Sequence, residues 1–201
     1  MRKDELIASV QKLIVKQGLT QDSLKSVHPK VVEGEISKAY NSLMKAFYQD
    51  PINLMNAELD FFAKKYTASI QRDVDGFYYV DLPARPVQLI DNLGVRSVKP
   101  KGGEQSFIRS SEVAMESIRR LPIYCCMKDG YYYLDGNKIM FDFPVKEHHI
   151  VEEVYLKILP LFEEFDDSDN IEFPQGDAPA MQMILTLMGI RPTDNINDDV
   201  R

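Results

Sequence analysis

The sequence predicts an α+β fold in which N- and C-terminal helices form a helical bundle with inserted antiparallel β-hairpins. Apolar residues recur at helical spacing in residues 1–62 and again near 177–188, whereas residues 63–161 alternate around turns that contain glycine. We therefore expect a single domain over residues 1–201. It would comprise a helical part (1–62), a β-rich part (63–161) and a last part (162–201) with an acidic loop, the C-terminal helix and a tail.

Three helices are expected in the first part. One covers residues 3–17 and ends at Gly18, a second begins at Pro29, and a third begins at Asp50-Pro51, with Asp50 as its N-cap, and reaches Phe62. None of their apolar stripes is long enough to be stable alone, so we expect them to pack with the last helix. The predicted shared core consists of Val32, Ile36, Leu43, Phe47, Leu59, Ile184, Leu185 and Met188.

The middle of the chain predicts strands. Residues 65–71 and 77–82 flank the turn 73–76, residues 94–99 form a further strand, and residues 111–119 form a short helix. A second hairpin joins 123–127 to 131–134 through 128–130, and the turn 135–137 leads into 138–143. Residues 151–161 fit a strand or a helix, and the alternation of Val154, Leu156 and Ile158 before Pro160 favours a strand.

Composition limits the possible classes of protein. The chain is 44% hydrophobic and 27% charged, as in ordinary soluble domains. No apolar run approaches the roughly 20 residues of a membrane span, and residues 1–5 do not begin a signal peptide, so we expect no membrane partner. Cys125 and Cys126 are adjacent on a predicted strand and point to opposite faces, which disfavours a mutual disulfide and favours a reducing compartment.

The acidity is local. Residues 1–62 hold 8 Lys/Arg and 8 Asp/Glu, residues 63–150 hold 13 and 11, and residues 151–201 hold 3 and 12. The acidic loop is either a solvated loop or a docking surface for a basic partner, with apolar contacts from Phe165, Ile171 and Phe173. The partner-binding carboxylates would be Glu163, Glu164, Asp166, Asp167 and Asp169.

No recognisable motif indicates catalysis, a cofactor or a metal. The loop 99–103 lacks the ending of a phosphate-binding loop, and residues 166–170 lack the glycine and glutamate of a calcium loop. His148 and His149 have no zinc-site spacing, and Ser110 and Ser111 lie in no nucleophile motif. We therefore expect no enzyme, although a small enzyme with an acidic metal site is the weakest of three hypotheses.

Two tyrosine clusters, 77–79 and 131–133, fall on predicted strands. Exposed tyrosines stack on nucleic acids or glycans and also contribute to protein interfaces. The acidic chain favours protein contact. We expect the second hairpin to project as a partner-binding element, with Tyr131, Tyr132 and Tyr133 as contact residues and Phe173 contributing from the acidic end.

The order of these elements resembles the head-to-tail connector (adaptor or ring) proteins of short-tailed bacteriophages, above all those of crAss-like phages. The resemblance covers most of residues 1–200 and depends on YYYLDGNKIMF at 131–141, VYLKI at 154–158, the acidic loop, Phe173-Pro174, the helix with Ile184-Leu185 and Asn197-Asp198. It implies a virion structural protein of the neck or tail, assembled in the host cytoplasm. Such a protein would be a subunit of a ring, usually dodecameric, that links the portal to the tail.

The resemblance also implies the partners: identical subunits, the portal protein and other tail ring or hub proteins, with non-specific proximity to packaged double-stranded DNA. The charges agree with a ring, because a basic middle segment and an acidic end form a complementary head-to-tail pair. That basic segment contains Arg85, Arg96, Lys99, Lys101, Arg109, Arg119 and Arg120. The alternative is a monomeric protein-binding or regulatory module that uses the tyrosine-rich sheet.

Overall fold

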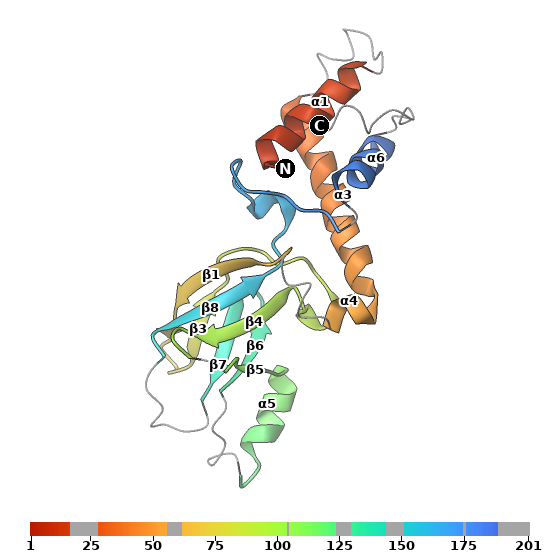
Figure 1. The fold of residues 1–201 in the computed structure, drawn as a ribbon. Coiled ribbons are helices and arrows are strands. Elements are labelled where there is room, and N and C mark those ends of the chain that lie inside the picture. Colours follow the sequence, from red (N-terminus) through yellow and green to blue (C-terminus); the bar gives the residue numbers. More distant parts are fainter. Residues whose placement is uncertain are drawn as a thin grey trace. The chain divides into compact units, whose positions relative to one another are not determined.

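The computed structural model describes residues 1–16, 28–55, 62–103, 105–123, 130–143, 151–174 and 176–188. It confirms the α+β class, with five α-helices and two sheets among these residues. The chain divides into two compact units (Figure 1). Unit 1 is Met1–Leu59 with Pro160–Arg201, and unit 2 is the continuous stretch Asp60–Leu159. The expectation of a single domain stays a prediction.

Unit 1 contains four helices. They are α1 (Lys3–Lys16), α3 (Pro29–Gln49), α4 (Pro51–Met55) and α6 (Asp177–Leu187), with the short 3-10 helix η4 (Phe162–Glu164). α3 begins at Pro29, whose fixed backbone suits a first turn, and its N-cap His28 accepts a hydrogen bond from the backbone N–H of Lys30. The Asp50 carboxylate caps α4 by accepting the Ile52 N–H at 2.9 Å, as predicted.

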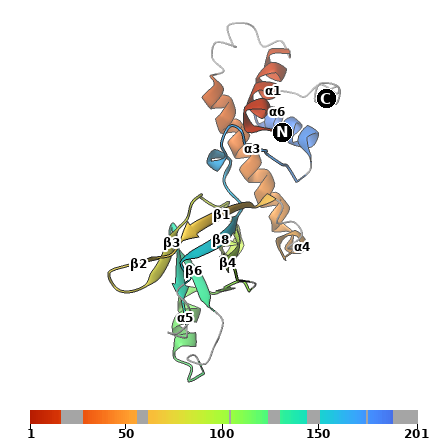
Figure 2. The ribbon, with the colours of Figure 1, turned by 60° about the vertical axis from the view of Figure 1, so that its left-hand side comes forward.

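α1 and α6 both pack against α3, and they lie beside it in both views (Figures 1 and 2). Five of the residues predicted for a shared core are buried: Val32, Ile36, Leu43, Ile184 and Leu185. Phe47 and Met188 are only half-buried, and Leu59 and the predicted cap Gly18 lie outside the described residues. Tyr48 takes the buried position in the last turn of α3, with its ring edge against Phe47 at 5.1 Å between centroids.

Unit 2 contains two sheets. The three-stranded sheet has the order β1 (Lys64–Ser69), β8 (Glu153–Ile158), β4 (Val95–Pro100), and all its pairs are antiparallel. The five-stranded sheet has the order β2 (Gln71–Arg72), β3 (Tyr78–Asp81), β7 (Lys138–Asp142), β6 (Tyr131–Asp135), β5 (Ile108–Arg109). Unit 2 also contains the 3-10 helix η2 (Ile90–Asn92) and the helix α5 (Glu112–Arg119).

The predicted hairpins are only part of this topology. β2–β3 and β6–β7 are hairpins around the turns 73–76 and 136–137, and residues 153–158 form a strand, as predicted. However, β1 pairs with β8 rather than with the strand that follows it, and β5 pairs with β6 in parallel. Residues 124–129 and 144–150, with Cys125, Cys126, His148 and His149, lie outside the described residues.

One core joins the two sheets. Its apolar side chains come from the alternating buried positions of β8 and from the facing strands of the larger sheet. A bulge at Arg96 breaks the alternation in β4, so Val95 and Val98, three positions apart, both face inward. The buried cluster consists of Val80, Leu82, Val95, Val98, Tyr132, Ile139, Phe141, Val154, Leu156 and Ile158.

Gly94 is required where β4 begins. A Cβ at this position would lie 2.2 Å from the Val87 carbonyl oxygen and 2.9 Å from the Pro86 side chain. The close approach lets the Gly94 carbonyl accept the Leu159 N–H while the Val87 N–H donates to the Leu159 carbonyl. Gly94 thereby fixes the end of β8 against the start of β4.

Replacing Leu43 with Ala should lower the free energy of unfolding by about 2–5 kcal/mol, because the side chain is buried between helices and its removal leaves a cavity. Urea unfolding followed by far-UV circular dichroism measures this loss. The matched control is Val31→Ala in the same helix, where the side chain is 52% exposed and the expected change is within about 0.5 kcal/mol. Equal midpoints for the two variants would remove Leu43 from the core.

Candidate functional site

The tyrosine strand β6 is mostly a packing element. Tyr131 and Tyr132 are 9% and 3% exposed, and Tyr132 belongs to the core between the sheets. The expectation that all three tyrosines project as contact area is therefore corrected, because both faces of β6 are covered at its start. Tyr133 is half-buried and lies near Glu112 and Arg119 of α5, so its role in partner binding stays a prediction.

Tyr132 and Arg109 form a buried polar pair beside β4. Burial raises the pKa of the Tyr132 hydroxyl, and the Arg109 guanidinium partly offsets this rise. Arg109 donates to the carbonyl of Val95 at 3.4 Å and to that of Asn92, next to the left-handed residues Asp91 and Asn92. Arg109 thus holds an irregular loop in place, and it is not a freely exposed cation.

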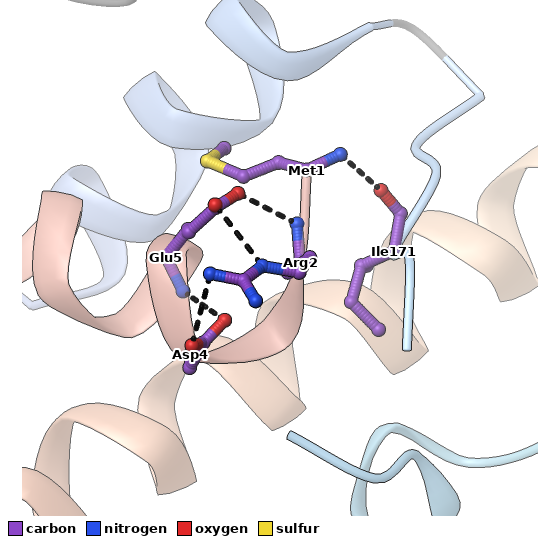
Figure 3. Close-up of polar contacts among 5 residues, drawn as sticks. All are labelled: Met1, Arg2, Asp4, Glu5 and Ile171. Atoms are coloured by element: carbon purple, nitrogen blue, oxygen red, sulfur yellow. Dashed lines mark hydrogen bonds and ion pairs between the residues drawn. The ribbon is translucent and has the colours of Figure 1, made fainter. Parts of the chain in front are cut away.

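The acidic segment, residues 162–173, is joined to the start of α1 through its backbone. The Lys3 and Asp4 N–H groups donate to the carbonyls of Asp169 and Asp167 at 3.0 and 3.2 Å. The Ile171 N–H donates to the Met1 carbonyl at 2.8 Å, and the Met1 nitrogen donates to the Ile171 carbonyl at 3.3 Å (Figure 3). These bonds satisfy N–H groups that the first turn of a helix leaves without intrahelical partners.

Lys3 is the buried cation of this contact, and its side chain is only 6% exposed. Its ammonium donates to the Phe165 carbonyl at 3.0 Å, pairs with Glu33 of α3 at 2.9 Å and lies 5.3 Å from the centroid of the Phe162 ring. Lys3 therefore joins α1, α3 and the acidic segment. Sequence reasoning missed it, because a lysine in a first helical turn next to acidic residues resembles a solvated surface charge.

Three aromatic rings of the acidic segment surround Tyr40 of α3. The centroids of Phe162, Phe165 and Phe173 lie 5.7, 5.7 and 5.8 Å from that of Tyr40. Phe165, Phe173 and Ile171 are all buried. The expectation that these side chains supply contacts to a partner is therefore corrected, because they fasten the acidic segment to unit 1.

The carboxylates of the acidic segment point outward around this fastened backbone. Asp166 and Asp167 are exposed, whereas Asp169 is half-buried and its carboxylate accepts the Asp166 N–H at 2.8 Å. Glu163 is exposed and accepts a hydrogen bond from Ser37 of α3, and Glu164 is half-buried. These carboxylates flank the start of α1, which adds two more.

We call Asp4, Glu5, Asp166 and Asp167, all exposed, the acidic surface. Arg2 pairs with both residues of α1, with its guanidinium 3.4 Å from Asp4 and 3.0 Å from Glu5 (Figure 3). The acidic surface therefore combines two chain segments that are more than 150 residues apart. Their backbones are joined by hydrogen bonds, so the carboxylates are held in fixed relative positions.

The outer face of the three-stranded sheet carries a second charged surface. In the register of β1, β8 and β4, Lys65 lies opposite Lys157 and Thr67 lies opposite Tyr155, which in turn lies opposite Lys99. Lys101 continues this face beyond β4 and forms an ion pair with Glu153, which raises the pKa of the Lys101 ammonium. We call this the lysine–tyrosine face; its members are Lys65, Thr67, Ser69, Ser97, Lys99, Lys101, Glu153, Tyr155 and Lys157.

The remaining searches give few positive findings. Among the described residues, no cluster of three His, Cys, Asp or Glu side chains is arranged to hold a metal ion. Within the same ranges, no helix has the length and apolar character needed to cross a membrane. No protein-family model and no curated protein matches the chain. The functional argument therefore depends on the two charged surfaces.

Replacing Lys3 with Ala should lower the free energy of unfolding by about 1–3 kcal/mol, because it removes the buried donor of the Phe165 carbonyl and one partner of a half-exposed ion pair. Chemical denaturation measures the loss. Lys12→Ala is the matched control, since Lys12 is exposed on the same helix. Similar losses in the two variants would show that the Lys3 contacts contribute nothing beyond helix propensity.

Replacing Tyr132 with Phe should reduce the loss of stability at alkaline pH. The raised pKa favours the neutral phenol in the folded state, so its contribution is fully present below the ordinary tyrosine pKa of about 10 and is lost as pH rises through the folded pKa. Unfolding free energies measured on both sides of that range test this. Tyr79→Phe removes an exposed hydroxyl and is the control; an alkaline loss as steep in Tyr132→Phe as in the unsubstituted chain contradicts the assignment.

Proposed function

We propose that the chain is a virion structural protein, a subunit of a homo-oligomeric adaptor ring that links the portal to the tail of a short-tailed bacteriophage. The observation that supports this is the separation of charge between two surfaces. Unit 1 holds 10 Lys/Arg and 17 Asp/Glu, whereas unit 2 holds 14 of each, so the net charge of −7 belongs to unit 1. A ring needs two different surfaces that meet head to tail, because only heterologous contacts generate rings with more than two members.

The fold is compatible with this function. In the proposed subunit, the terminal helices form the helical bundle that packs side by side around the ring, and unit 2 is the inserted β-rich part that contacts neighbours. The ring is a dodecamer in the neck of the virion, assembled in the host cytoplasm, and its neighbours are the portal protein and tail ring or hub proteins. An acidic chain suits a channel for packaged DNA, since strongly cationic walls would retain phosphate groups.

The mass of the assembled particle tests the proposal. The chain is co-expressed with the portal protein of the virus that encodes it, and native mass spectrometry measures the complexes. A complex that contains portal and a closed ring of this chain is the expected result. A chain that stays monomeric at high concentration and never associates with portal contradicts it. The portal must be present, because subunits of such rings can remain monomeric until they meet a template.

A monomeric protein-binding module is the second candidate. The tyrosine-rich sheet supports it less than the sequence indicated, because Tyr131 and Tyr132 are buried. A different observation favours it: Val113, Leu121 and Ile123, on and after α5, are 74%, 48% and 60% exposed. Exposed apolar side chains this close in sequence are typical of protein contacts. Binding of one partner by a monomer would support this candidate.

Neutralising the acidic segment should slow assembly without harming the fold. In the variant Asp166→Asn with Asp167→Asn, we expect slower association at low ionic strength and a flatter salt dependence, because electrostatic steering is reduced. Stability should be equal or slightly higher, since like-charge repulsion is removed. Asp169 is kept because its carboxylate accepts the Asp166 N–H.

Light scattering at low and high salt measures these assembly rates. Glu116→Gln, an exposed change on α5, is the control for the loss of a carboxylate elsewhere. An identical salt response in the double variant and the unsubstituted chain would mean that the acidic segment is a solvated loop.

A further inference from the structure

The lysine–tyrosine face has a charge arrangement that folding alone does not explain. Lys65 and Lys157 are directly opposite in an antiparallel pair, where like charges destabilise a sheet. Lys99 occupies the next row of the same face. The face holds four lysines and one carboxylate, Glu153, which is paired with Lys101. An anionic surface placed over it would offset this repulsion.

Tyr155 lies at the centre of the face. Its side chain is 46% exposed, although the other side of the same strand, at Val154 and Leu156, is fully buried. Thr67 and Lys99 flank it on the neighbouring strands. An exposed tyrosine on a rigid strand, surrounded by cations, is typical of the centre of a protein interface, where it offers large contact area and few rotamers to immobilise.

The acidic surface of unit 1 is the complementary partner on the same chain. Asp4, Glu5, Asp166 and Asp167 are exposed, and their backbones are joined by hydrogen bonds before any contact is made. A surface ordered in advance loses less conformational entropy on binding. A nucleic acid is the weaker candidate, because Glu153 lies within the face and the chain as a whole carries −7.

We propose that the lysine–tyrosine face of one copy binds the acidic surface of a second copy. This inference rests on the proposed ring function and assigns the head-to-tail contact within it. Each copy carries one surface of each kind, so the contact repeats from subunit to subunit. Charge sets orientation and association rate, whereas Tyr155 supplies buried contact area at the centre.

A charge-swap experiment in the full chain tests this contact. One variant carries Lys65→Glu with Lys99→Glu, and the other carries Asp166→Lys with Asp167→Lys. Each is expected to self-associate roughly tenfold or more weakly than the unsubstituted chain, because like charges then face each other. An equal mixture should recover association as a one-to-one complex, since the two altered surfaces are complementary. Sedimentation velocity measures association, with portal protein as template where the chain alone stays monomeric.

Controls separate this contact from general charge effects. Lys12→Glu on α1 and Glu116→Lys on α5 reverse exposed charges outside both surfaces and should leave association unchanged. Tyr155→Ser should weaken association while leaving secondary structure intact, whereas Val74→Ser, at a fully exposed turn position, should not. If a reversed variant fails to fold by circular dichroism, Lys65→Gln with Lys99→Gln replaces it and should show a weaker loss.

The outcomes distinguish this inference from the ring function. Rings that assemble normally from the face variants would overturn the contact and leave the ring intact. A chain that never associates, with or without portal, would overturn both. A salt-sensitive change that does not depend on protein concentration would indicate a contact within one chain and would also overturn it. So would a short DNA duplex that binds the unsubstituted chain but not the face variants, when self-association is equal.

Discussion

The contact between the start of α1 and the acidic segment is the constraint on which unit 1 depends. It joins residues 1–4 to residues 165–171 through paired backbone groups, the buried Lys3 ammonium and the rings around Tyr40. The unit is otherwise made of two separate stretches of chain, so it is complete only when these meet. The acidic character follows from this role: helix N–H groups and a buried ammonium favour a segment rich in carbonyls and carboxylates.

This constraint also explains how one segment serves two purposes. Its apolar residues and carbonyls face inward, where Phe162, Phe165 and Ile171 pack, and its carboxylates face outward. A docking surface built on a loop normally loses affinity when the loop is ordered on binding. Here the backbone is ordered by contacts inside unit 1, so the exposed carboxylates behave as part of a rigid helix end.

Local pattern predicted most elements but not their partners. The starts of α3 and α6, the cap at Asp50 and the strand at 153–158 follow from proline, capping and alternation. The pairing of β1 with β8 and the parallel pair β5–β6 involve residues distant in sequence, and the bulge at Arg96 changes a register that alternation assumes regular. The lysine–tyrosine face was missed for the same reason, because it combines three distant strands. Tyrosine repeats at 131–133 gave no signal that both faces of β6 are covered.

The pairing of Lys64 with Ile158 has a consequence for the order of folding. These residues lie at the entrance and exit of unit 2, and the register places them directly opposite each other. Unit 2 is one continuous stretch, so all its contacts are available once residue 159 has left the ribosome. Unit 1 must wait for α6, although α1 and α3 are made first. The closed ends of unit 2 bring the two stretches of unit 1 to one point, so the inserted unit acts as a short covalent staple for the helices that precede and follow it.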